Sequence, residues 1–174
     1  MKIQEFAFDD KKLLDSCMKR FCYYHENGIV GNKIYEGYNF PVHVVYNFIK
    51  KLTKDELWLK QHIKREVVYI VGYMKGNKEV MIHELRHADF YTDVKIQHDI
   101  KHVWESLPKN IRTDIESQFT SLGYNRNVWI DELYAYLNDR TFWSKKVYKM
   151  LSETYDFHTN KNEFKTKSSL YYRK

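Results

Sequence analysis

Cysteine, proline and glycine are scarce in this chain of 174 residues, which contains two cysteines, two prolines and six glycines. So few glycines and prolines do not suit a loop-rich all-β domain, and we expect helices to dominate. Apolar clusters such as Val67–Val71 are far shorter than the roughly 20 residues that a membrane span requires. The first ten residues have no apolar core of the kind that predicts a signal peptide. We therefore expect a cytoplasmic protein without a membrane span, in a cell or in the cytosol of a host if the chain is viral.

The two cysteines do not form the pattern of a disulfide scaffold. Cys17 and Cys22 lie five residues apart on a predicted helix, which places them on one side of it but not close enough for an easy bridge. We expect both to be reduced residues of the hydrophobic core.

Hydrophobic residues make up 43% of the chain, aromatic residues 17% and charged residues 30%, which excludes a disordered or low-complexity protein. The length suits one domain, which we assign to residues 1–159. Periodicity fades after Thr159, so residues 160–174 are predicted to be a flexible basic tail.

The net charge of +6 lies mostly in that tail. The last fourteen residues carry +4, and the other 160 residues carry only +2, from 24 basic and 22 acidic side chains. Binding to nucleic acid is therefore not favoured, and the tail is the one segment through which it would occur. The charged residues of the tail are Lys161, Lys165, Lys167, Arg173 and Lys174 against Glu163.

The first half of the chain shows clear signals for helices and one strand. A helix capped by Asp9 or Asp10 runs through Cys22, and Thr53–Glu56 has the capping-box pattern that opens a second helix. Residues 66–73 are β-branched and aromatic, as expected for a strand, and a helix over 78–91 follows. Residues 42–48 fit either a strand or a helix.

Four more helices are predicted downstream, over 96–107, over 112–122, from a cap at Asn127 through Leu137, and over 142–151. The predicted fold class is therefore α+β and helix-dominated. A small sheet would pack against the helix over 78–91 and against further helices.

That helix contains the segment that carries chemistry, His83-Glu84-Leu85-Arg86-His87, in which two histidines lie four residues apart. Positions i and i+4 lie on one face of a helix, so both imidazoles can reach one zinc ion. The glutamate beside the first histidine can then take a proton from a water at the metal.

Chance does not explain the pattern well. Eight histidines and twelve glutamates among 174 residues predict only about 0.02 such motifs in a random order of the same composition. The structural alternative is a helix whose histidines merely share a face. The apolar neighbours Ile82, Leu85 and Ala88 predict a buried helix, where two histidines and a carboxylate without partners would be costly.

The strand, the turn and His83-Glu84-Leu85-Arg86-His87-Ala88 resemble the metal-binding core of zincin-type metallopeptidases, over about a third of the chain. The resemblance implies that His83 and His87 bind one zinc ion and that Glu84 is the general base. It also implies a peptide or protein substrate. The strand around Tyr69–Tyr73 would be the edge of the sheet along which an extended peptide docks.

A catalytic zinc ion has three protein ligands and one open position, so a third ligand is expected downstream. Asp93 lies where metzincin-like enzymes place theirs, but Phe90 stands where those enzymes need a glycine. His98 and His102 lie four apart on the next helix, and one such histidine completes the site in Spartan-type proteases. Both are mixed with charged residues, which equally suits an exposed face.

Glu132 is the preferred third ligand. It stands inside an apolar helix, Trp129–Leu137, where a carboxylate needs a cation or a donor, and Ala135 allows a neighbouring helix to come close. The segment resembles the glutamate helix of gluzincins, although Tyr136 replaces the acid often found there. The orientation of a ligand histidine would be fixed by an acid that does not itself bind the metal, and the candidates are Asp89, Asp131 and Asp139.

The expected function is therefore zinc-dependent hydrolysis of peptide bonds, with Tyr155 or His158 as candidate donors to the transition state. With 15 tyrosines in the chain, packing explains any one of them more simply. Two alternatives stay open. They are a Spartan-like protease acting on DNA-bound proteins, with His98 or His102 as third ligand, and a zincin-like binding protein without catalysis. A peptide deformylase is disfavoured because neither Cys17 nor Cys22 supplies its local cysteine pattern.

Overall fold

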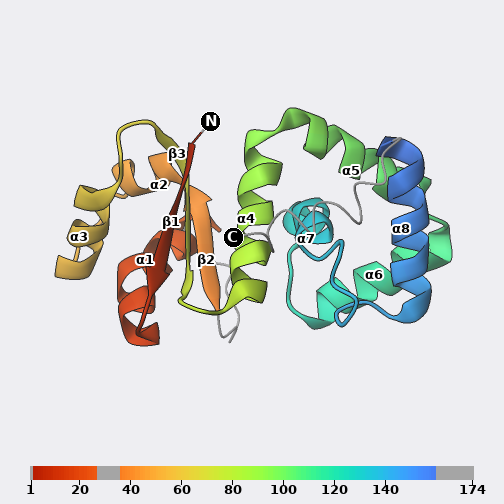
Figure 1. The fold of residues 1–174 in the computed structure, drawn as a ribbon, viewed down its shortest axis with the longest axis horizontal. Helices are drawn as coiled ribbons and strands as arrows, with labels where there is room; N and C mark the ends of the chain where they lie inside the picture. Colours follow the sequence, from red (N-terminus) through yellow and green to blue (C-terminus); the bar gives the residue numbers. More distant parts are fainter. Residues whose placement is uncertain (1, 27–35, 160–174) are drawn as a thin grey trace. The chain divides into compact units, whose positions relative to one another are not determined.

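The computed structural model describes residues 2–26 and 36–159, with side chains as far as Tyr155. The described chain is α+β and helix-dominated, as the sequence predicts, and it contains one three-stranded sheet (Figure 1). It divides into two compact units, Met1–Thr92 and Asp93–Lys174. The single domain assigned to 1–159 remains an interpretation of the sequence, and the predicted tail lies outside the described residues. No described helix combines the length and the apolar character needed to cross a membrane.

The first unit is built around the sheet, whose strands are β1 (Lys2–Phe8), β2 (Gly37–Pro41) and β3 (Val67–Met74). Their order is β1-β3-β2, with β3 parallel to β1 and antiparallel to β2. β3 is therefore the central strand. The prediction that the strand around Tyr69–Tyr73 forms the edge of the sheet is wrong, because that strand pairs on both of its sides.

Helices cover both faces of this sheet. α1 (Lys11–His25) lies on one face and α4 (Lys78–Thr92) on the other (Figure 1). Residues alternate between the faces. Phe40 of β2 contacts Phe21 of α1, whereas Tyr69 of β3 contacts Tyr91 of α4. The short helix α2 (Val42–Tyr46) follows β2 directly. The segment 42–48, which fits a strand or a helix by its sequence, is therefore helical over its first five residues.

Local signals explain why these helices begin where they do. Asp10 caps α1, and its side chain accepts a hydrogen bond from the backbone N–H of Lys12. α3 (Lys54–His62) opens with the predicted capping box between Thr53 and Glu56. α1 also packs closely on the sheet at Gly72, where an added Cβ would lie 1.9 Å from the sulfur of Met18. Glycine at this position of β3 therefore permits the close packing of α1, and a larger residue would require the Met18 side chain to move.

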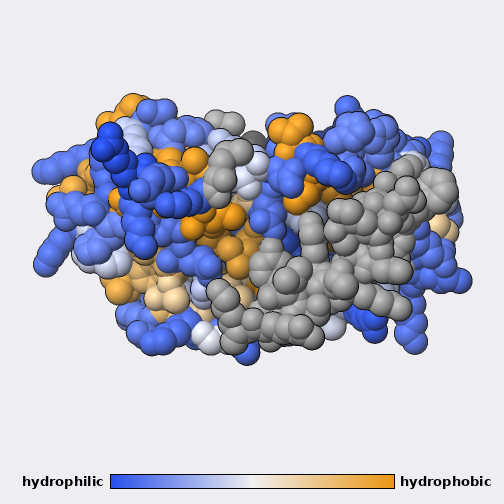
Figure 2. All heavy atoms as spheres, turned by 45° about the horizontal axis from the view of Figure 1, so that its top comes forward, coloured by the Kyte–Doolittle hydropathy of each residue, from blue (hydrophilic) through white to orange (hydrophobic). Residues whose placement is uncertain are grey.

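The second unit is helical. It contains α5 (Val94–Ser106), α6 (Lys109–Ser121), the 3₁₀ turn η1 (Arg126–Val128), α7 (Trp129–Ala135) and α8 (Lys145–Thr159). Asn125 caps η1, and α7 follows from Val128 without a side-chain cap, so the predicted cap at Asn127 is wrong. α8 begins three residues after the predicted start at Phe142. In the face drawn in Figure 2, hydrophilic side chains surround separate hydrophobic patches.

Candidate metal centre

His83 and His87 lie one turn apart on α4, on the same face of the helix, as their spacing predicts. Their Nε2 atoms are 3.1 Å apart and their ring centroids are 4.8 Å apart. His87 is buried and His83 is half-buried. α4 follows β3 through a turn in which the side chain of Asn77 accepts from the backbone N–H of Val80, so the helix start is fixed next to the sheet.

The separation of the two nitrogens is compatible with a shared zinc ion. Two nitrogens that each lie about 2.0–2.1 Å from one ion are about 2.8–3.4 Å apart, for angles between a right angle and the tetrahedral value. The observed 3.1 Å falls inside that range. It also suits a hydrogen bond from one neutral ring to the other, with the donor set by the tautomers. The nitrogen separation is therefore compatible with a shared zinc ion and with a direct hydrogen bond between the rings.

Glu84 is buried, with 7% of its surface exposed, and its carboxylate is held from the sheet. The side-chain amide of Asn39 donates a hydrogen bond to Oε2 of Glu84 at 2.5 Å. The hydroxyl of Tyr69 donates to the amide oxygen of Asn39 at 2.6 Å. Because the oxygen of Asn39 accepts from Tyr69, its NH₂ group is directed at Glu84. This chain of donors fixes the orientation of the carboxylate.

Gly37 of β2 brings the backbone of the sheet against the same carboxylate. A Cβ at this position would lie 2.5 Å from Oε1 of Glu84 and 2.7 Å from a methyl group of Val80. Neither separation is tolerated in a packed interior, so β2 can approach α4 this closely only with glycine there.

Sequence reasoning missed Gly37 and Asn39, because β2 was not among the predicted strands. The five residues Gly37-Tyr38-Asn39-Phe40-Pro41 do alternate, with Tyr38 and Phe40 on the α1 face of the sheet. That alternation is the one local signal that could have identified the strand. It would still not have shown that Asn39 faces Glu84, since this follows from the pairing of β2 with β3.

The two cysteines are free and buried, as predicted. Burial raises the pKa of Cys17 to about 11. Burial also raises the pKa of Cys22 well above its ordinary value, and the nearby charge of Glu26 adds to the shift. Since a thiol must lose its proton to bind a metal, neither residue is suited to be a ligand.

Glu132 lies on α7 in the second unit, with 8% of its surface exposed. Its neighbours in this unit include a pair of tyrosines, Tyr124 and Tyr136, whose hydroxyl oxygens are 3.0 Å apart. Burial raises the pKa of Tyr124 far above its ordinary value, and the negative charge of Glu132 raises it further. The carboxylate is thus held among aromatic residues, with the Tyr124 hydroxyl as a hydrogen-bond donor, and its charge would be stabilised further by a cation.

The other predicted site residues in the second unit differ from Glu132. Asp93 caps α5, and its carboxylate accepts from the backbone N–H groups of Lys95 and Ile96. The carboxylate of Asp139 accepts from the backbone and hydroxyl of Thr141 and holds a turn. Each therefore has a local structural role.

The remaining candidates divide between surface and core. His98 and His102 lie on an exposed face of α5. Tyr155 is buried on α8, and the side chain of His158 lies outside the described part of the chain.

No protein-family model, no curated protein and no solved structure matches the chain.

Proposed function

We propose that the protein is a zinc-dependent metallopeptidase in which His83, His87 and Glu132 hold one zinc ion and Glu84 is the general base. The observation that carries the proposal is the arrangement on α4: two histidine nitrogens at 3.1 Å and a buried glutamate oriented by Asn39. Two imidazoles and a carboxylate, each offering one ligand atom, form a donor set that suits zinc.

Burial and charge favour Glu132 over the histidines of α5 as third ligand. The carboxylate is buried on an apolar helix, and a cation would compensate the cost of its charge. The carboxylate of Glu132 would also lower the net charge of the zinc ion together with its ligands, as the glutamate of a His₂Glu set does in catalytic zinc sites. His98 and His102 are exposed and their Nε2 atoms contact each other. Neither residue therefore has a buried charge that a cation would stabilise.

Each of the chain's own groups then has a defined task in peptide hydrolysis. Zinc would supply a Lewis acid that polarises the scissile carbonyl and makes a water more acidic. Glu84 accepts the proton of the attacking water and delivers it to the nitrogen of the departing amine. Asn39 keeps the carboxylate in one orientation during both transfers, because it occupies Oε2.

Since β3 is central, β1 and β2 are the two edges of the sheet within the described residues, and β2 is the edge whose Gly37 lies next to Glu84. β2 lies against α4, where Gly37 contacts the side chain of Glu84. A peptide added antiparallel or parallel to this edge would gain backbone hydrogen bonds whatever its side chains. We therefore expect an extended peptide substrate to pair with β2 and not with β3.

The decisive test compares Glu84→Gln with the wild-type chain. The amide cannot accept the proton, so hydrolysis of an unfolded protein substrate should fall by at least about a hundredfold, while the zinc content stays near one per chain. Glu79→Gln, on the exposed first turn of the same helix, is the matched control and should keep its activity. Full activity of Glu84→Gln, or a purified protein that neither contains nor binds zinc, would contradict the proposal.

Variants of the candidate third ligands distinguish a site completed by Glu132 from one completed by His98 or His102. Glu132→Ala should lose zinc, whereas His98→Ala and His102→Ala should keep the ion of the α4 site. The opposite result, together with salt-dependent retention of the protein on DNA, would favour the Spartan-like protease.

A further inference from the structure

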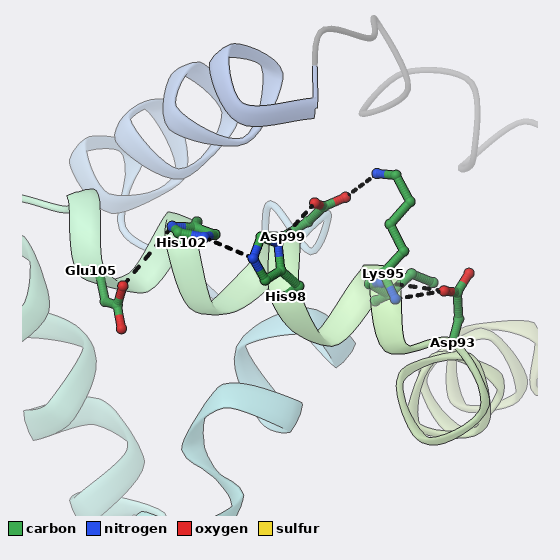
Figure 3. Close-up of polar contacts among 7 residues, drawn as sticks. Asp93, Lys95, His98, Asp99, His102 and Glu105 are labelled. Atoms are coloured by element: carbon green, nitrogen blue, oxygen red, sulfur yellow. Dashed lines mark hydrogen bonds and ion pairs between the residues drawn. The ribbon is translucent and has the colours of Figure 1, made fainter.

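α5 carries a second pair of histidines at helical spacing, shown in Figure 3. The Nε2 atoms of His98 and His102 are 3.1 Å apart, and their ring centroids are 4.3 Å apart. The nitrogen separation equals that of His83 and His87 on α4. It therefore lies in the same range, about 2.8–3.4 Å, that two nitrogen ligands of one metal ion require.

The surroundings of the two histidine pairs differ. The side chains of His98 and His102 are 69% and 48% exposed, so an ion and its waters can reach both nitrogens from solvent. Backbone hydrogen bonds of α5 hold the two Cα atoms, and only side-chain freedom is lost on binding. A preformed pair on a rigid helix loses less entropy than two histidines on loops.

Two carboxylates lie on the outer sides of the rings. Oδ1 of Asp99 is 3.9 Å from Nδ1 of His98, and Oε2 of Glu105 is 4.0 Å from Nδ1 of His102 (Figure 3). Both distances are too long for a hydrogen bond, but the negative charge of the two acids favours a cation close to the rings. Lys95 pairs with Asp99 and offsets part of that charge.

We infer that His98 and His102 form a second metal site, which takes a divalent transition-metal ion that prefers imidazole, such as Cu²⁺, Ni²⁺ or Zn²⁺. Only two protein ligands and an exposed position make this site weaker than one with three ligands. Water would fill the remaining positions. Affinity should follow the general order for nitrogen ligands, with Cu²⁺ bound more tightly than Ni²⁺ or Zn²⁺. The inference does not depend on the proposed peptidase activity.

The test is a calorimetric titration of the full chain, without a histidine tag, with Ni²⁺. His83→Ala/His87→Ala removes the histidines of α4 and should still bind one ion per chain. Adding His98→Ala/His102→Ala should abolish that binding. His43→Ala in the same background is the matched control, because His43 is exposed on α2 and no histidine lies three or four residues from it. This variant should bind Ni²⁺ as tightly as His83→Ala/His87→Ala does.

Single variants sharpen the result. His98→Ala or His102→Ala alone, in the background without the α4 histidines, leaves one nitrogen ligand and should weaken Ni²⁺ binding by about tenfold or more. Losing a residue that only supports a ligand already costs about tenfold in metal affinity, and losing a ligand should cost at least as much. Alanine has the highest helix propensity, so these exposed substitutions should preserve α5, which circular dichroism would check. With Cu²⁺, electron paramagnetic resonance should report two nitrogen ligands when both histidines are present.

Three results would overturn the inference. One is that His83→Ala/His87→Ala binds no ion, and another is that it binds equally well after His98 and His102 are replaced. The third is that His98→Ala/His102→Ala, with the α4 histidines intact, loses the ion of the α4 site, because the α5 pair would then belong to that site.

Discussion

A general base must hold its carboxylate toward the reacting water, and the sheet would provide that restraint for Glu84, the proposed base. The chain from Tyr69 through Asn39 to Glu84 consists of two short hydrogen bonds, at 2.6 and 2.5 Å. An amide oxygen only accepts and an amide NH₂ group only donates, so the direction of the chain is fixed. Gly37 then places backbone directly against the other carboxylate oxygen. Positioning by β2 is therefore as much a part of the proposed mechanism as the motif itself.

We predict that Asn39→Leu impairs catalysis without removing zinc, because it deletes the donor to Glu84 and changes no proposed ligand. A misplaced catalytic group commonly costs up to about a hundredfold in rate, and we expect kcat to fall by about ten- to a hundredfold with a smaller change in KM. Steady-state kinetics and zinc analysis of the same preparation would measure both effects. Tyr69→Phe removes only the second donor and should have a weaker effect in the same direction.

Tyr73→Phe is the control for that experiment. Tyr73 lies on the same strand, and its hydroxyl donates to the exposed carboxylate of Glu5 at 2.7 Å, away from Glu84. It should retain wild-type kinetics. Wild-type kcat in both Asn39→Leu and Tyr69→Phe would show that the hydrogen-bond chain has no role in orienting Glu84.

The candidate site could be predicted in part. The His83–His87 pair follows from sequence spacing, because helical periodicity alone brings both rings to one face. Gly37 and Asn39 are 47 and 45 residues before Glu84 (84 − 37 and 84 − 39). Their contact with it depends on the pairing of β2 with β3, which is a long-range property that no local pattern reports.

Among the elements, α3 shows most clearly how one local signal stabilises both a helix and its packing. Thr53 accepts from the backbone N–H of Glu56, and the carboxylate of Glu56 accepts in return from the backbone N–H of Thr53. The same carboxylate is fully buried and pairs with Arg20 of α1 at 2.9 Å. The capping box therefore also holds the acid that joins α3 to α1.

We expect Thr53→Ala to lower the free energy of unfolding by about 1 kcal/mol, since it removes the acceptor for an N–H at the helix start. Urea denaturation followed by circular dichroism would measure the change. Thr53→Ser keeps the hydroxyl and should remain close to wild type. An unchanged midpoint in Thr53→Ala would mean that the cap contributes nothing to stability.

The elements that the sequence predicts well are those with strong local signals. α1, α3 and α4 have a cap or an apolar stripe, and β3 has a continuous β-branched and aromatic run. β1 and β2 were missed because their patterns are weak. In β1 only Phe6 and Phe8 are buried, and β2 is five residues long with glycine and proline at its ends. Pairing with β3 makes them strands, and propensity does not.

At the scale of the whole molecule, the proposed ligands belong to both compact units, with His83 and His87 in the first and Glu132 in the second. If one ion binds all three, its binding free energy adds to the stability of the folded chain. Saturating zinc at a thousand times its dissociation constant would contribute about 4 kcal/mol. Chelation should therefore lower the thermal midpoint of unfolding, and reloading with zinc should restore it.

Glu132→Gln makes this prediction specific to the proposed third ligand. The amide has nearly the same shape as the carboxylate but binds zinc poorly, so the variant should show a much smaller gain in thermal midpoint on adding zinc than the wild-type chain. Without metal, the variant should be at least as stable as the wild type, because the amide carries no buried charge. Differential scanning calorimetry with zinc and with a chelator measures both differences. A zinc-dependent gain equal to that of the wild type would remove Glu132 from the ligand set and leave the histidines of α4 to be completed by another residue.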